Sequence, residues 1–179
     1  MKILIVSDTH RNNRNFLRVV ERTGPLDMVV HCGDVEGSEL LISGAAGCPV
    51  EMVQGNNDFF SELPREREFT IGRYKVWLTH GHNYYIAMSN EMIKEEARAR
   101  HVDIVMCGHT HRPVVEIDGD ITLVNPGSIS YPRGKYTAIG GTFAIVETFA
   151  DENGKQIEVQ YYDRELNAIP ELQVIFNGK

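Results

Sequence analysis

Residues 2–10, KILIVSDTH, decide the fold, because an apolar run that predicts a buried strand leads directly into an aspartate and a histidine. The same arrangement recurs four times further along the chain, where a short polar segment follows a strand-like run. These segments are Cys32-Gly33-Asp34, Gly55-Asn56-Asn57-Asp58, Thr79-His80-Gly81-His82 and Gly108-His109-Thr110-His111. Since strand ends at one edge of an α/β sheet converge, we expect the five segments to meet in space.

The remaining pattern predicts a four-layer sandwich. The first half reads as strands at 2–6, 27–32 and 49–53 with helices at 12–23 and 38–46 between them, which implies parallel strands with crossover connections. The second half is rich in hairpins, around one further helix at 88–100 and a buried strand at 102–107. Two mixed sheets packed together with helices outside, an α/β/β/α arrangement, accommodate both halves.

Three strand pairs carry the hairpin prediction. Their partners are 67–71 with 74–79, 113–117 with 121–124, and 142–148 with 156–163, the last joined through 151–154. The final stretch, 166–179, is either a short edge strand or a terminal segment packed on a neighbour. No repeat or linker divides the chain, so we expect a single domain over 1–179.

Composition limits the classes of function. The chain has 179 residues, 42% of them hydrophobic and 24% charged, which is typical of a soluble globular protein. No apolar run approaches the roughly 18 residues of a membrane span, and the N-terminus does not resemble a signal peptide. The formal net charge of −7 argues against binding to long nucleic acids and favours a small anionic substrate at a locally positive, cation-loaded site.

The cysteines favour a reducing compartment. Cys32, Cys48 and Cys107 are odd in number and lack CxxC spacing, so a disulfide framework is not expected and a cytoplasmic location is. Cys32 and Cys107 lie beside proposed ligands, which makes thiolate ligation conceivable. Burial as small packing residues is the favoured interpretation.

The five polar segments together indicate two divalent cations. Alone, Asp8 with His10 is a weak signal that favours a turn aspartate beside a surface histidine, and Asp34 alone favours a turn or helix-cap residue. In an extended backbone, alternate residues point the same way, so Asp8 and His10 can face one cation. Carboxylates, an amide and imidazoles gathered at strand ends form the mixed oxygen and nitrogen donor set of a two-metal hydrolytic site acting on a phosphate ester.

The order and spacing of these segments resemble the calcineurin-like metallophosphoesterase superfamily, and the short length resembles its small bacterial and archaeal YfcE-type phosphodiesterase branch. The segment Asn125-Pro126-Gly127-Ser128 with Pro132-Arg133 fits the same branch. The resemblance covers nearly the whole chain and implies a metallophosphoesterase-like fold. It also implies two bound divalent ions, with Mn²⁺ as the choice and Zn²⁺, Fe²⁺ or Ni²⁺ as alternatives.

The resemblance also implies roles for individual residues. One metal would be held by Asp8, His10 and His111. The other would be held by Asn56, His80 and His109, with the Asp34 carboxylate bridging the pair. A hydroxide between the cations would then attack phosphorus directly, without a covalent enzyme intermediate.

Two positions depart from the wider family pattern. Asn57 stands where many members have a histidine that protonates the leaving group, and an amide cannot supply that proton. We therefore expect small phosphodiesters, or esters with good leaving groups, to be hydrolysed better than alkyl monoesters. Arg11 stands where glycine is common, and either reaches substrate phosphate or, in the favoured interpretation, is a solvated residue at a helix entry.

Neighbouring residues receive supporting roles. Asp58 is expected to fix its turn or to orient a ligand, and it is grouped with Asp34 and Asn57 as catalytic. His82 is expected to lie behind the ligands or toward the substrate, and His31 to be a satisfied buried histidine. Residues 125–128 read either as part of the substrate rim or as a turn that ends a strand.

Two other functions compete with hydrolysis of small esters. A retromer subunit of the same fold resembles a degraded phosphoesterase and works as a protein-binding scaffold, a function that predicts missing ligands. A nuclease is disfavoured by the acidic balance and by the absence of a basic-aromatic tract. Exposed hairpin edges late in the chain are compatible with a homo-oligomer.

Overall fold

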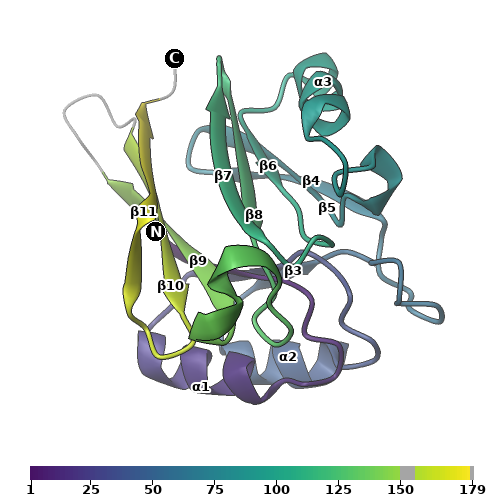
Figure 1. The fold of residues 1–179 in the computed structure, drawn as a ribbon, viewed down its shortest axis with the longest axis vertical. Helices are drawn as coiled ribbons and strands as arrows, with labels where there is room; N and C mark the ends of the chain where they lie inside the picture. The colour runs from purple at the N-terminus through teal and green to yellow at the C-terminus, as the bar shows by residue number, and fades with distance from the viewer. Residues whose placement is uncertain (150–155, 178–179) are drawn as a thin grey trace.

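Two mixed β-sheets lie face to face in the computed structural model, which describes residues 1–149 and 156–177 (Figure 1). The first sheet has the strand order β11-β10-β9-β1-β2-β3, with β1, β2 and β3 parallel and β9 antiparallel to β1. Its strands are β1 (Lys2–Val6), β2 (Met28–His31), β3 (Val50–Met52), β9 (Thr142–Phe149), β10 (Gln156–Asp163) and β11 (Ala168–Asn177).

The second sheet has the order β4-β5-β6-β8-β7. Three central strands run parallel, and an antiparallel hairpin partner closes each edge. The strands are β4 (Glu66–Ile71), β5 (Tyr74–Thr79), β6 (Ile104–Met106), β7 (Pro113–Asp118) and β8 (Ile121–Pro126).

Helices cover the outer faces of both sheets (Figure 1). Two lie against the first sheet and one against the second: α1 (Arg14–Thr23), α2 (Glu39–Ala46) and α3 (Glu91–Arg100). Two short 3₁₀ helices, η1 (His82–Tyr84) and η2 (Gly134–Ile139), complete the helical elements of the described ranges. Among the described residues, no helix is long and apolar enough to cross a membrane.

The side-chain alternation of β1 shows how the layers are held. Ile3 and Ile5 belong to the core between the sheets, whereas Leu4 and Val6 belong to the core shared with α1 and α2. All four are fully buried, because a strand between two apolar layers has no face left for water. A third core lies between the second sheet and α3. The predicted four-layer α/β/β/α sandwich is confirmed.

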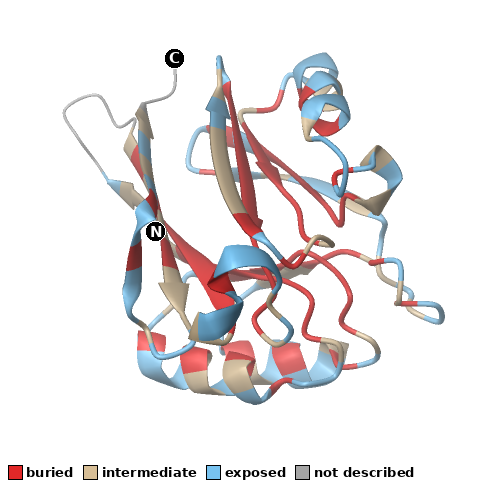
Figure 2. Ribbon diagram, viewed as in Figure 1, coloured by how far each residue is buried: buried red, intermediate tan, exposed pale blue. Residues whose placement is uncertain are grey.

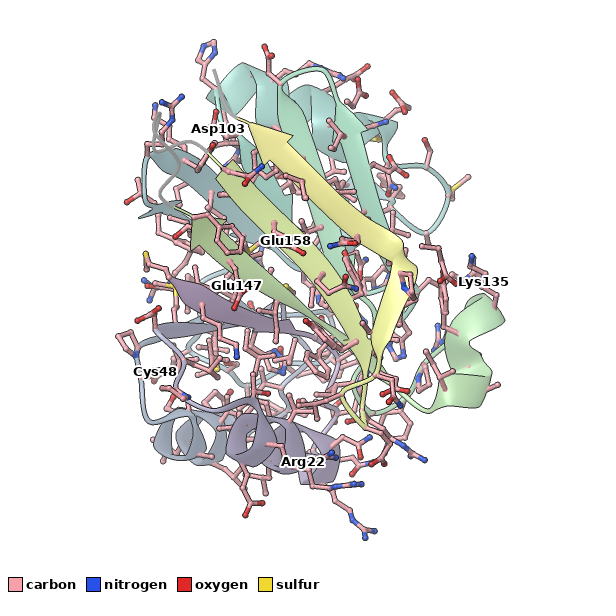
Figure 3. The ribbon with its side chains drawn as sticks, turned by 90° about the vertical axis from the view of Figure 1, so that its left-hand side faces the viewer. Arg22, Cys48, Asp103, Lys135, Glu147 and Glu158 are labelled. Carbon is pink, nitrogen blue, oxygen red and sulfur yellow. The ribbon has the colours of Figure 1, made fainter. Side chains whose placement is uncertain are left out.

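The outer face of the first sheet is only partly covered. Figure 3 looks onto the half formed by β9, β10 and β11, where Glu147 of β9 and Glu158 of β10 stand on the same face. These two residues are direct cross-strand partners. The helices therefore protect the half that leads to the polar strand ends, and charged side chains face outward on the other half.

The elements differ from the sequence prediction mainly at their ends. Helix α1 begins at Arg14 instead of residue 12, and α3 at Glu91 instead of residue 88, because turns such as Asn12 N–H to the Thr9 carbonyl and Met88 N–H to the Tyr85 carbonyl precede them. The alternatives for 166–179 are resolved in favour of an edge strand, β11, paired with β10. The expected link at 151–154 lies outside the described residues.

Candidate metal centre

The polar segments meet where strands of both sheets end. Burial continues past the strands into these loops, as Figure 2 shows, and Ser7, Asp8 and Thr9 are as inaccessible as the strand before them. Backbone bonds tie the segments together: the Asp8 N–H donates to the Gly33 carbonyl at 3.1 Å, and the Gly108 N–H donates to the His80 carbonyl at 3.1 Å. The second of these bonds joins the segment after β6 to the segment after β5.

The backbone of these loops is left-handed at the residues that carry the chemistry. Asp8, His10, Asp34, His109 and His111 have φ values of 55°, 45°, 58°, 65° and 58°. Non-glycine residues seldom adopt this conformation, and each instance costs of order 1 kcal/mol or more. The expectation of an extended backbone at Asp8 and His10 was therefore wrong. The two side chains converge because the chain turns, not because it is straight.

The first group of donors contains Asp8, His10 and His111. The Nε2 atoms of the two histidines lie 3.1 Å apart. Asp8 Oδ1 is 3.2 Å from His111 Nε2 and 3.8 Å from His10 Nε2. One donor atom from each of the three residues thus falls within 4.8 Å of the others, close enough to share a cation.

The second group contains Asn56, His80 and His109. Asn56 Oδ1 lies 3.1 Å from His80 Nε2, and the His80 and His109 rings are 5.3 Å apart between centroids. His80 is fully buried, whereas Asn56 is exposed and His109 is intermediate. The second group therefore opens to solvent more than the first.

Asp34 lies between the two groups. Its Oδ2 atom is 3.6 Å from His10 Nε2 and 3.5 Å from His80 Nε2. Burial alone would raise the pKa of Asp34, but His80 and the Asn57 hydrogen bonds hold it well below the usual range. The carboxylate is consequently ionised at neutral pH and faces a donor from each side.

The Nδ1 hydrogen bonds of three histidines leave their Nε2 atoms facing the proposed centre. The Nδ1 atoms of His10, His80 and His111 lie 2.6–2.7 Å from the Glu36 carboxylate, the Cys32 carbonyl and the Tyr131 carbonyl, so each Nδ1 carries the hydrogen. In the neutral rings each Nε2 is then an acceptor. Two acceptors at 3.1 Å repel each other unless a proton or a metal cation lies between them, and metal-binding histidines are oriented by Nδ1 hydrogen bonds of this kind.

Asp8 provides a second sign that the donors suit a cation. Its Oδ1 atom is buried and accepts no hydrogen bond from the described part of the chain. Burial opposes ionisation of this carboxyl, yet the neighbouring His111 and His80 lower its pKa. A buried, charged oxygen without a partner costs folding free energy that coordination would recover. The donor set therefore fits divalent cations.

Asn57 and Asp58 fix the position of Asp34 and of the loop that carries it. Asn57 donates to both oxygens of Asp34, through its backbone N–H at 2.8 Å and its Nδ2 at 2.7 Å. The Asp58 carboxylate accepts from the N–H groups of Asp34, Glu36 and Gly55 at 2.5–2.8 Å. Both residues orient Asp34 and its loop, as expected for Asp58, and the catalytic assignment of the two residues stays a prediction.

Glycines allow the loops to approach closely. A Cβ at Gly55 would collide with the Asp34 side chain, and one at Gly108 would collide with Ser7 Oγ and lie 2.9 Å from Asp8 Oδ2. Only glycine leaves room for the two carboxylates at these positions.

Sequence reasoning missed Glu36 and Tyr131. Glu36 fixes His10, and the Tyr131 carbonyl fixes His111, while the Tyr131 ring stands edge-on to His10 at 5.7 Å. The spacing of Glu36 two residues after Asp34, which repeats the Asp8–His10 spacing, was a usable signal. A backbone carbonyl leaves no such trace in the sequence. Arg11 is exposed and donates through Nε to the Glu36 carbonyl, in line with its favoured interpretation as a solvated residue.

The remaining singled-out residues support the centre or the core. His31 is fully buried, with Nδ1 accepting from the Gly33 N–H and Nε2 3.2 Å from Thr9 Oγ1, as predicted for a satisfied histidine. Asn125 and Ser128 are buried and donate to the Gly108 and Asp8 carbonyls, so they brace the loops and do not form a rim. The His82 ring lies 5.4 Å from that of His80. Cys32 and Cys107 are buried core residues, which agrees with the favoured interpretation of these cysteines.

Known proteins share both the sequence pattern and the fold. Residues 1–151 match the family model of the calcineurin-like phosphoesterase superfamily domain. The probable metallophosphoesterase YsnB of Bacillus subtilis is 32% identical over 174 residues, which cover 97% of each chain. A predicted phosphoesterase of Streptococcus pneumoniae has a solved structure that is 30% identical, with a TM-score of 0.82 over 98% of this chain and 97% of that one.

More distant solved structures share the fold alone. A mutant of Vps29 from Entamoeba histolytica is 24% identical, with a TM-score of 0.79 over 99% of this chain and 100% of that one. The Escherichia coli phosphoesterase Yfce is 21% identical, with a TM-score of 0.65 over 97% and 98%. On the family match and the identity to YsnB, this chain belongs to the calcineurin-like phosphoesterase superfamily.

Proposed function

We propose that this protein is a dinuclear, metal-dependent phosphodiesterase that hydrolyses small phosphodiesters in the cytoplasm. Asp8, His10 and His111 would hold one cation and Asn56, His80 and His109 the other, with Asp34 between them. The observation that carries the proposal is the pair of fixed tautomers that direct the Nε2 atoms of His10 and His111 at each other across 3.1 Å. We propose Mn²⁺ as the metal on the family resemblance, and a single domain over the whole chain.

Bound divalent cations would activate a water as nucleophile and neutralise charge that develops on the phosphoryl oxygens. The residues of the chain supply orientation. Asn57 fixes the Asp34 carboxylate, Asp58 fixes the Asp34 backbone, and Glu36, Cys32 and Tyr131 fix the imidazoles.

The leaving group decides the substrate class. The Asn57 amide is committed to Asp34, and an amide has no proton to give to a departing alkoxide. Diesters, and esters whose leaving groups need no protonation, are therefore the proposed substrates.

Hydrolysis of bis-p-nitrophenyl phosphate by protein loaded with Mn²⁺ tests this function. We expect Asp34→Asn to lower kcat/KM by more than about 100-fold, because a change at a ligand itself should exceed the 10- to 100-fold effect of changes behind ligands. His101→Asn, at an exposed helix end, is the control and should leave the rate unchanged. Faster cleavage of alkyl monoesters than of diesters would contradict the argument from Asn57.

The fold shared with Vps29 favours a second candidate, a catalytically weak scaffold that binds another protein. That function does not require a complete donor set, whereas donor atoms of Asp8, His10, Asp34, His80 and His111 fall into two close groups here, with Asn56 and His109 beside His80. Two bound cations without turnover of any tested diester would favour the scaffold over the enzyme.

A further inference from the structure

A hollow of about 680 Å³ lies beside the donor groups. The residues that matter for its chemistry come from the loop after β2 and from the 57–63 loop, and they are Glu36, Asn57, Phe59, Phe60 and Leu63. Its size falls in the range of about 300–1,000 Å³ that small-molecule sites occupy.

Two lining residues of the hollow contact the proposed centre. Asn57 lines it and also donates to the Asp34 carboxylate at 2.7 Å. Glu36 lines it as well and bonds to His10 at 2.6 Å. An ester whose phosphoryl group lies at the donors therefore has this space within reach of one of its substituents.

Two adjacent aromatic rings in this wall are exposed to solvent. Phe59 is 77% exposed and Phe60 is fully exposed. Exposed aromatic pairs are uncommon on a soluble surface and mark a site where something binds. A flat ring that stacked on them would remove apolar area from water on both partners.

The charges of the wall indicate what kind of ring fits. Glu36, Glu39, Asp58 and Glu62 line the hollow, and Arg11 is the one basic residue of its lining. A second phosphate or a carboxylate would be repelled by this acidic lining. The acidic lining therefore disfavours an anionic occupant.

A second hollow, of about 300 Å³, shares Phe59 and Asp58 with the first and is otherwise lined differently. Its remaining polar residues are Gln54, Asn56, Arg65, His82 and Asn83. It offers amides and a guanidinium in place of a second aromatic ring, so the larger hollow is the one that suits an apolar group.

We propose that the larger hollow is a substrate subsite, in which Phe59 and Phe60 stack on an uncharged aromatic ring carried by the phosphodiester. This subsite determines specificity for diesters that bear an aryl group or a nucleobase. The proposal rests on the proposed function, because the donors must hold the phosphoryl group for the ring to reach the hollow.

Calorimetric binding to Mn²⁺-loaded protein tests the subsite without turnover. Phenylphosphonate and methylphosphonate share the anionic group and differ only in the ring. Adenosine 5′-monophosphate and ribose 5-phosphate form the corresponding pair for a nucleobase. We expect the ring-bearing member of at least one pair to bind about tenfold more tightly, since base–aromatic stacking contributes about 1–3 kcal/mol. The pair that shows the gain identifies the ring class.

Phe60→Ala should abolish that gain and leave the ring-free ligands unchanged. The side chain is fully exposed, so its removal deprives the fold of no packing. Phe149→Ala, a half-exposed phenylalanine at the end of β9, is the matched control and should keep the gain.

The outcomes separate this proposal from the proposed function. Equal binding within both pairs, or a gain that survives in Phe60→Ala, overturns the subsite even when bis-p-nitrophenyl phosphate is hydrolysed. Failure of all four ligands to bind, together with no hydrolysis, overturns both proposals.

Discussion

The interior of β1 and the loop at its carboxyl end are equally buried but differ in polarity and in backbone conformation. Ile3–Val6 are apolar, regular and paired on both sides with β2 and β9. Ser7, Asp8 and Thr9 are also fully buried, yet they are polar, and Asp8 has a left-handed backbone and an unpartnered oxygen. Burial stabilises the first segment and costs free energy in the second. Burial of the polar end therefore does not account for the stability of the fold, in contrast to burial of the strand.

Removing an apolar side chain from the strand interior should produce the largest loss of stability. Ile5 is fully buried in the core between the sheets, so Ile5→Ala should lower the free energy of unfolding by about 4 kcal/mol. Urea denaturation of metal-free protein measures the change. Leu17→Ala, on the exposed side of α1, is the control and should change it by less than about 1 kcal/mol.

Cation affinity of the folded Ile5→Ala protein sharpens the comparison. Ile5 belongs to the core between the sheets and is not one of the seven proposed donors. The affinity for Mn²⁺ should therefore match that of the unsubstituted protein. A large loss of affinity would contradict the division between the strand interior and its end.

His31, the last residue of β2, stands at the boundary between the two kinds of region and should make stability depend on pH. Burial lowers the pKa of His31 to about 4, from about 6.5 in the unfolded chain. Below pH 6.5, His31 is protonated in the unfolded state but stays neutral in the folded state. The free energy of unfolding therefore has its full value above pH 6.5, and about 3 kcal/mol of it is lost as the pH falls to about 4.

The measurement is the free energy of unfolding of metal-free protein between pH 7 and 4. Nearby carboxylates raise the pKa values of His80 and His111 against the effect of burial, and these two histidines therefore act in the opposite sense. The difference between the unsubstituted protein and His31→Gln isolates His31, with His101→Asn as the control. Identical pH slopes in all three proteins would show that His31 is not held neutral.

The strand interiors were predictable because their signals are local. Apolar runs marked β1, β2, β5 and β6, and the Gly72-Arg73 spacer marked the hairpin of β4 with β5. The pairing of β9 with β1, which closes the first sheet, joins residues about 140 positions apart and has no local signal.

The strand ends were predictable in composition but not in conformation. Donor residue types in five segments predicted a cluster, and the structure gathers donor atoms of Asp8, His10, Asp34, His80 and His111 into two groups, with Asn56 and His109 beside His80. The left-handed turns depend on contacts between segments, such as the His10 N–H to the Asp34 carbonyl at 3.0 Å. For the same reason the sequence could not show that Asn57 faces Asp34, or that Glu36 faces His10.

A substitution of Glu36 tests how the residues around the donors affect cation binding, because Glu36 contacts a proposed ligand without being one itself. Its carboxylate fixes the tautomer of His10 through a 2.6 Å contact with Nδ1. Glu36→Gln keeps the size but removes the charge, so His10 should become a less basic and less oriented donor. We expect affinity for the cation held by His10 to fall about 10- to 100-fold, with little change at the cation held by His80.

Calorimetric titration of metal-free protein with Mn²⁺ resolves the two binding steps. Glu39→Gln is the matched control, because Glu39 lines the same hollow but bonds to Ser61 Oγ and not to a donor. A shift confined to one step in Glu36→Gln, and absent in Glu39→Gln, would assign the two groups of donors to separate cations. An equal shift of both steps would mean that the loop after β2 supports the centre as one unit, and the distinction between the two donor groups would fail.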